Sequence, residues 1–143
     1  MTKLLLAFLL LTIQFQVDAQ RQGIQGQVFW IGGNQMPGPG KSISPQQGIV
    51  REIVIFHEVK LQDTNQKDGF FTDINSEPVA SLFSNADGSF HIQLPSGKYS
   101  VFVKETKGLF ANLFDAQGNI NPVIVKDKKY SWITLSVDYE AVY

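Results

Sequence analysis

The chain has 143 residues, a formal net charge of −1 and no cysteine. This length suits one domain and is too short for two independent cores. The lack of cysteine excludes disulfides, a thiolate nucleophile, thiolate metal sites and a lipidated N-terminal cysteine. Because acidic and basic residues nearly balance, the composition gives no electrostatic support for a nucleic-acid or anionic-membrane surface.

The first residues have the layout of a secretory signal peptide. Lys3 precedes an apolar run from Leu4 to Ile13, in which Thr12 is the one polar residue, and a polar stretch follows with small residues at Val17 and Ala19. A membrane-crossing helix needs about 20 apolar residues, and an anchor extended through the polar stretch would bury three polar side chains in lipid. We therefore expect a signal peptide at residues 1–19. The mature domain, residues 20–143, is then secreted or periplasmic, without stable membrane insertion after cleavage.

After residue 20, apolar and polar residues alternate with a period of two, interrupted at intervals by Gly, Pro, Asn or Asp. This pattern predicts strands, and no stretch has a helical period. Residues 32–48 contain five Gly and three Pro and are predicted to form a long loop. The predicted strands cover residues 23–31, 50–61, 70–74, 78–83, 90–94, 99–103, 123–126 and 132–139.

The most regular stretch is residues 85–103. Its first four residues suit a turn, and Pro95-Ser96-Gly97 suits a second one. Between and after these turns, apolar residues alternate with polar ones, which predicts a β-hairpin with one buried face. Seven or eight short strands in one small domain indicate an all-β, two-sheet sandwich.

The pattern Asn85-x-Asp87-Gly88-x-Phe90-x-Ile92-x-Leu94-Pro95-x-Gly97-x-Tyr99-x-Val101 resembles the carboxypeptidase regulatory-like domain, also called prealbumin-like or transthyretin-like. Including Gly26-Gln27-Val28, Pro37-Gly38 and Val79-Ala80-Ser81, the resemblance covers most of residues 23–104. It implies a Greek-key β-sandwich of seven strands, common in exported Bacteroidetes-type proteins and without catalytic residues. A related branch hydrolyses 5-hydroxyisourate, but its N-terminal histidine and C-terminal Tyr-Arg-Gly-Ser are absent here.

Residues that could carry chemistry are few. The two histidines, His57 and His91, are too few for a zinc centre, and Glu58 would point to the opposite strand face from His57. A hydrolase would require both histidines to converge on one pocket.

The acidic residues also favour a non-catalytic interpretation. Asp73, Asp87 and Asp115 lie at predicted turns, where solvated acids are the norm. The turns at residues 85–88 and 115–119 gather oxygen atoms suitable for calcium, yet such turns form without metal. We predict no catalytic residue, no metal and no cofactor.

Aromatic residues supply the candidate binding sites. Phe102 and Trp132 lie on the polar parity of their strands, and together with Trp30 they are candidates for a ligand-stacking surface or, alternatively, for cross-strand packing. Leu109, Phe110, Leu113 and Phe114 have the spacing of one short helical turn. This turn is expected to plug the sandwich or, if exposed, to dock a protein.

The sequence thus predicts an exported, non-catalytic β-sandwich module with a binding or structural role. Its partner would be a cell-envelope protein or a glycan, and no nucleic acid. The alternatives are a carbohydrate-binding module that uses its exposed aromatics, an accessory subunit of an outer-membrane or cell-surface assembly and, last, a hydrolase.

Overall fold

The computed structural model describes residues 21–41 and 46–143, and the predicted signal peptide lies outside the described residues. The described part of the chain is all-β apart from a 3-10 turn, η1, at Leu61–Asp63. Its strands are β1 (Gly23–Asn34), β2 (Gln47–Gly48), β3 (Glu52–His57), β4 (Asn65–Lys67), β5 (Phe70–Thr72), β6 (Ala80–Phe83), β7 (Ser89–Gln93), β8 (Gly97–Glu105), β9 (Gly108–Phe110), β10 (Pro122–Val125) and β11 (Tyr130–Val142).

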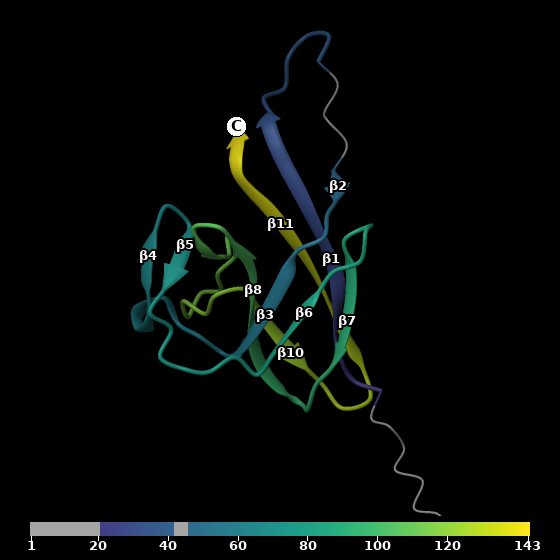
Figure 1. Cartoon of the computed structure of the whole chain (residues 1–143), viewed down its shortest axis with the longest axis vertical. Helices are drawn as coiled ribbons and strands as arrows, with labels where there is room; N and C mark the ends of the chain where they lie inside the picture. The colour runs from purple at the N-terminus through teal and green to yellow at the C-terminus, as the bar shows by residue number, and fades with distance from the viewer. Residues whose placement is uncertain (1–20, 42–45) are drawn as a thin grey trace, which may run out of the picture.

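The strands form two sheets, as the sequence predicts (Figure 1). Sheet A has the order β11-β1-β2, and β7 also pairs with β1. Sheet B has the order β4-β5-β9-β8-β3-β6, and β10 also pairs with β8. The first and last strands, β1 and β11, pair in parallel and extend together beyond the body of the sandwich. The structure has more strands than predicted because the short strands β2 and β4 pair along the edges of the sheets and β9 lies between β5 and β8.

The main core lies between the two sheets. Alternate residues of the long strands point into it, including Ile24 and Val28 from β1, Val101 and Val103 from β8, and Ile133, Leu135 and Val137 from β11. These are the apolar positions of the period-two pattern, and each is almost completely buried. Burying this apolar surface is the main term that stabilises the sandwich.

A second core covers the other side of sheet B. Val54, Phe56 and Phe102 point away from sheet A and pack under Phe71 of β5 and under Ala111 and Ile120 of the segment between β9 and β10. Strands β3 and β8 are therefore buried on both faces. The prediction of one buried face for the hairpin that contains β8 is wrong here, because residues far along the chain cover its second face and alternation cannot reveal this.

The predicted hairpin of residues 85–103 is wrong in its pairing, although its buried positions are correct. Strand β7 pairs with β1 in sheet A, whereas β8 pairs with β3, β9 and β10 in sheet B. The chain therefore crosses from one sheet to the other at Pro95-Ser96-Gly97, and the two apolar faces meet across the core. The hydroxyl of Tyr99 donates to the carbonyl oxygen of Pro95 at 2.6 Å and fastens this crossing.

The predicted turn before β7 is confirmed. The amide of Gly88 donates to the carbonyl oxygen of Asn85 at 2.9 Å, and Gly88 has a φ of 84°. A Cβ atom at this position would lie 2.1 Å from the carbonyl oxygen of Val28, so only glycine fits. The turn is thereby packed against β1 and fixes where β7 enters sheet A.

Candidate functional site

The outer face of sheet A is the candidate site, because it remains open to solvent. Side chains that point away from the core on its three main strands are each exposed or half-buried. They are mostly polar and include two aromatic residues. From β7, β1 and β11 respectively they are Ser89, His91 and Gln93; Gln25, Gln27 and Phe29; and Trp132, Thr134 and Ser136.

Trp132 dominates this face. Its side chain is 60% exposed, and its indole Nε1 donates to Thr134 Oγ1 at 3.1 Å, which holds the ring along β11. Strand register places Gln25 beside Trp132, and His91 beside Gln25 on the next strand. A ring, an amide and an imidazole thus form one row across three hydrogen-bonded strands. We call the row Trp132–Gln25–His91 the sheet A platform.

The turn before β7 borders the platform. Gln27 Nε2 donates to the carbonyl oxygen of Asp87 at 2.7 Å, so one outward amide of β1 is tied to this turn. Asp87 Oδ1 accepts from the hydroxyl of Ser89 at 2.6 Å and from its amide at 2.9 Å. These hydrogen bonds favour the carboxylate and lower the pKa of Asp87 below its ordinary value.

Phe102, the second predicted stacking residue, is not on the surface. Its side chain is 0% exposed and packs edge-on against Phe56 and Phe71, with ring centroids 5.5 Å and 5.7 Å away. The prediction is wrong for Phe102 because connecting segments cover the polar parity of β8. Phe102 is a core residue and cannot contact a ligand in this fold.

Trp30, the third predicted stacking residue, is half-buried at the end of the main core. Its ring meets that of Tyr139 edge-on, with centroids 5.3 Å apart, and the guanidinium carbon of Arg51 lies 5.9 Å from its centroid. These contacts link β1 and β11 of sheet A to Arg51, which directly precedes β3 of sheet B. Trp30 therefore closes the end of the sandwich and does not extend the sheet A platform.

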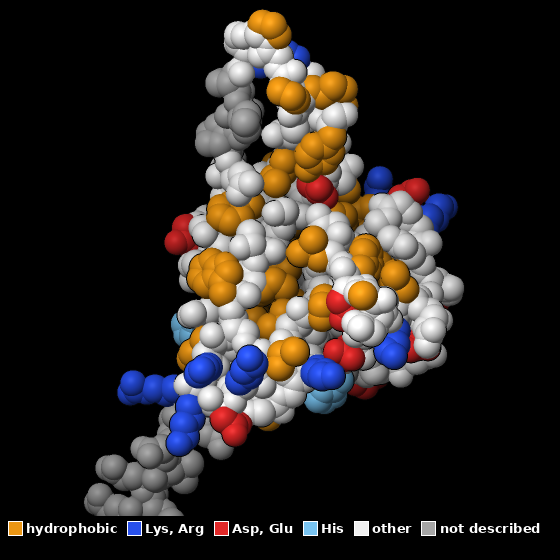
Figure 2. Space-filling model, turned by 180° about the vertical axis from the view of Figure 1, so that it is seen from behind, with side chains coloured by type: hydrophobic (Ala, Val, Ile, Leu, Met, Phe, Trp, Pro, Cys, Tyr) orange, Lys and Arg blue, Asp and Glu red, His pale blue; other side chains and the backbone are white. Residues whose placement is uncertain are grey.

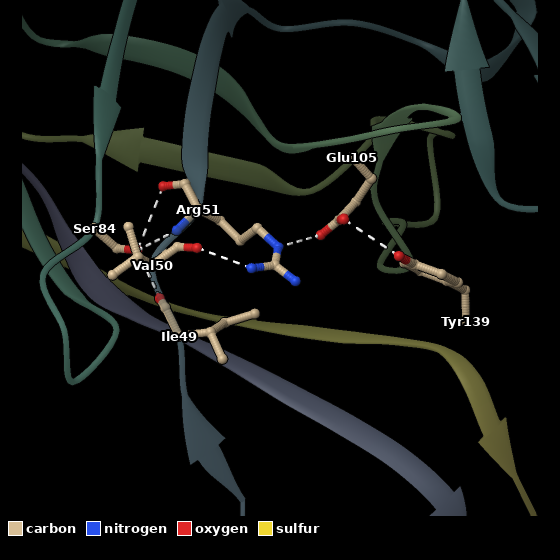
Figure 3. A network of polar contacts seen from close by, with 6 residues as sticks. All are labelled: Ile49, Val50, Arg51, Ser84, Glu105 and Tyr139. Atoms are coloured by element: carbon tan, nitrogen blue, oxygen red, sulfur yellow. Dashed lines mark hydrogen bonds and ion pairs between the residues drawn. The ribbon is translucent and has the colours of Figure 1, made fainter.

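Around Trp30, a polar network links the two sheets (Figure 3). Glu105 Oε1 accepts from Arg51 Nε at 2.9 Å, and Glu105 Oε2 accepts from the hydroxyl of Tyr139 at 3.2 Å. Ser84 Oγ accepts from the Arg51 amide at 2.8 Å and donates to the carbonyl oxygen of Ile49 at 2.7 Å. Burial, together with the nearby Glu105 carboxylate, raises the pKa of Tyr139.

The segment of residues 109–114 does not form the predicted helical turn. Gly108–Phe110 is strand β9, which pairs with β5 and β8, because two flanking strands offer this segment backbone partners. Phe110 is buried in the main core, and Leu109 packs against the second core. Leu113 and Phe114 remain 54% and 42% exposed. The predicted docking segment is thus divided into two core residues and two surface residues.

The two histidines are not brought together by the fold. His57 ends β3 in sheet B and stacks on Tyr99, with ring centroids 5.5 Å apart. His91 lies on the outer face of sheet A, on the opposite side of that sheet from the main core. Among residues 21–41 and 46–143, no cluster of three or more His, Cys, Asp or Glu side chains could hold a metal ion.

The predicted turn acids make local hydrogen bonds. Asp115 Oδ1 accepts from the amides of Gln117 and Asn119 at 3.0 Å and 2.8 Å, and its Oδ2 accepts from Asn119 Nδ2 at 2.8 Å. These bonds lower the pKa of Asp115, with the side chain of Asn119 the largest cause and Lys60 a smaller one. Asp73 accepts from Asn65 Nδ2 at 2.7 Å. Each of these acids organises the backbone or the neighbouring side chains.

A hollow of about 580 Å³ lies beside sheet B, outside the predicted sites. Two lysines and two acids balance within it, so the hollow has no dominant charge. It is lined by Glu58, Lys60, Lys98, Asp115, Gln117, Asn119, Pro122 and Ile124.

Comparison with known proteins does not identify the chain: no family model, curated protein or solved structure matches it. Within the described ranges, no helix has the length and apolar character needed to cross a membrane. Of this row, the sequence predicts Trp132 as a site residue but neither of its neighbours, Gln25 and His91. Their place on the polar parity of two predicted strands was the available signal, and only the register of β1 with β7 and β11 joins them in a row.

Proposed function

We propose that this chain is an exported, non-catalytic binding module that recognises its ligand with the outer face of sheet A. One observation carries the proposal: Trp132 is 60% exposed on the polar outer face of sheet A, where it lies on the edge strand β11. The other two predicted stacking residues, Trp30 and Phe102, are built into the packing. Exposed aromatic rings offer large contact area at low entropic cost, which makes them frequent anchors of binding surfaces.

The proposed ligand is a polysaccharide of the cell envelope or the surroundings. An indole held along a strand presents an apolar surface to the C–H face of a sugar ring. The amide of Gln25 and the imidazole of His91 lie next in the row and can exchange hydrogen bonds with sugar hydroxyls. The mechanism is surface recognition, in which no bond is made or broken.

Membership of the carboxypeptidase regulatory-like family and export by a signal peptide at residues 1–19 are parts of this proposal. The two-sheet sandwich supports the family assignment. The turn ending in Gly88 and the sheet crossing fastened by Tyr99 also support it, since both occur at positions of the family's pattern. Sequencing the N-terminus of the secreted or periplasmic protein tests the export, and Gln20 is the expected first residue.

The test of ligand binding is affinity electrophoresis of residues 20–143 through gels that contain a panel of polysaccharides. We expect retardation by at least one polysaccharide and a loss of about 10- to 30-fold in affinity for Trp132→Ala. The matched control is Phe83→Ala, because Phe83 is 68% exposed but lies on the edge strand of sheet B. Retardation by none of the polysaccharides, or equal retardation of Trp132→Ala and wild type, would refute the proposal.

A second candidate function, as accessory subunit of an envelope assembly, is favoured by the exposed pair Leu113 and Phe114. Apolar side chains at the surface of a covering loop are candidates for contact with another protein. If this function holds, Leu113→Ser/Phe114→Ser should abolish co-purification of a stoichiometric membrane partner while Trp132→Ala retains it. Retention by the double variant would exclude this surface.

A further inference from the structure

Five basic residues gather at one end of the sandwich, where the described chain begins. Strand β10 connects to β11 through a turn that contains Lys126, Lys128 and Lys129, and Lys98 lies opposite Ile124 near the start of this turn. Arg21 precedes β1, and the amide of Gly23 donates to the carbonyl oxygen of Lys129 at 3.2 Å. Figure 2 shows Lys and Arg side chains gathered over this end of the molecule. We call Arg21, Lys98, Lys126, Lys128 and Lys129 the basic end.

The basic end is built on a fixed framework. Gln22 is buried and bonds two other segments of the chain. At the sheet crossing, its Nε2 donates to the carbonyl oxygen of Leu94 at 3.2 Å and to Ser96 Oγ at 3.1 Å. In the β10–β11 turn, its Oε1 accepts from the Lys128 amide at 3.2 Å. The N-terminal segment, the sheet crossing and the β10–β11 turn are thereby tied together. The backbone segments that carry the positive charges are therefore held close to one another.

Acidic residues neutralise this end only in part. Asp127 is the one acid in its turn, and it accepts a hydrogen bond from the hydroxyl of Ser96. Lys98 also lines the hollow that contains Glu58 and Asp115, so the surplus of positive charge is concentrated on Arg21 and the three lysines of the turn. All five basic side chains are exposed. The balanced net charge of the chain conceals this local excess.

We propose that the basic end is a docking surface for the anionic phospholipids of a bilayer. The charges lie on the turn between β10 and β11, on the start of β8 and on Arg21 just before β1. All are exposed, and their positive charge is complementary to the negative headgroups of an anionic leaflet. In the sequence, Arg21 closely follows the predicted signal peptide at residues 1–19, a segment that is expected to engage a membrane during export. Lysine and arginine near an anionic leaflet each contribute attraction that falls off within a Debye length.

Co-sedimentation with vesicles tests the docking of residues 20–143. This mature chain retains every strand and both cores, which lie within residues 22–142. We expect binding to vesicles of phosphatidylglycerol and phosphatidylcholine, no binding to phosphatidylcholine alone, and weaker binding at high salt. Lys126→Gln/Lys128→Gln/Lys129→Gln should reduce partitioning about 100-fold.

Two triple variants make the test specific. Replacing the three lysines of the turn by arginine should retain binding, because the charges stay in place. Replacing Lys41, Lys67 and Lys107 by glutamine changes the net charge equally, but these exposed residues lie outside the basic end, so binding should stay within about twofold of wild type.

Three results would overturn the proposal. The first is failure to bind anionic vesicles at low salt, and the second is an equal loss in both glutamine triple variants. The third is tighter binding to heparin or to an oligonucleotide than to the vesicles, with the same dependence on the turn lysines, because the surface would then recognise a soluble polyanion.

Discussion

The two sheets of this sandwich differ in what covers their outer faces. Over sheet B, the segments that contain Phe71, Ala111 and Ile120 bury the outward residues of β3 and β8. Over sheet A, the outward residues of β1, β7 and β11 remain in contact with solvent. Sheet B is therefore packed on both of its faces at β3 and β8, whereas the outer face of sheet A is exposed and available for binding.

Phe102 and Trp132 show what this difference means for a sequence. Both are aromatic residues on the polar parity of a long strand, with lysines or hydroxyl residues as parity neighbours. One is 0% exposed and the other 60% exposed. Alternation along a strand reports which residues share a face, but only the rest of the chain decides whether that face is covered.

The largest expected effect is that of removing a side chain from the covered face. Phe102→Ala leaves a cavity between Phe56 and Phe71 and should lower the free energy of unfolding by about 3–5 kcal/mol, measured by urea denaturation. On the open face, Trp132→Ala should change it by less than about 0.5 kcal/mol.

Phe102→Leu serves as a milder variant in case the alanine protein does not fold, and it should still cost about 1–2 kcal/mol. Equal and small losses at Phe102 and Trp132 would contradict the assignment of a second core.

Much of the fold follows from the sequence because strand burial is a local pattern. The inward positions of β1, β8 and β11 alternate strictly, and each lies in the main core as predicted. The turn at Gly88 is equally local, since a positive φ and close backbone contact select glycine. All-β class, two sheets and most strand positions could therefore be predicted.

Pairing and cover could not be predicted, because both depend on residues far apart in sequence. Strand β7 has the same alternation whether it pairs with β8 or with β1, which lies more than 60 residues away. The spacing of apolar residues over 109–114 fits a helical turn, but β5 and β8 offer backbone partners to Gly108–Phe110, which forms strand β9 instead. In the candidate site, Trp132 could be predicted from the sequence. Its neighbours Gln25 and His91 could not, because they depend on the register of β1 with β11 and β7.

An intermediate effect is expected at the end of the sandwich that Trp30 closes, where Glu105 joins the two sheets. Glu105 accepts hydrogen bonds from Arg51 and Tyr139, and its side chain is only 7% exposed. Glu105→Gln removes the charge and one acceptor oxygen and should lower the free energy of unfolding by about 1–2 kcal/mol. The loss stays in this range because Arg51 is partly exposed and can bond water instead.

A double-mutant cycle with Tyr139→Phe isolates the bond between β8 and β11. If this bond links the sheets, the two losses will not be additive. Strict additivity would instead place Tyr139 in the interface through its ring contacts alone.

The smallest effect concerns how the cover over sheet B depends on pH. Asp115 organises the covering loop through hydrogen bonds from Gln117 and Asn119, and its folded-state pKa lies below the ordinary 3.8. A depressed carboxyl pKa stabilises the fold above pH 3.8, and this contribution is lost as the pH falls through the folded-state value. The melting temperature of Asp115→Asn should therefore be lower than that of wild type at pH 6, and the gap should close towards pH 3. Because hydrogen bonds outrank the attraction of Lys60 as the cause, the gap at pH 6 should persist at about 0.5 M salt, whereas screening would remove a purely Coulombic effect.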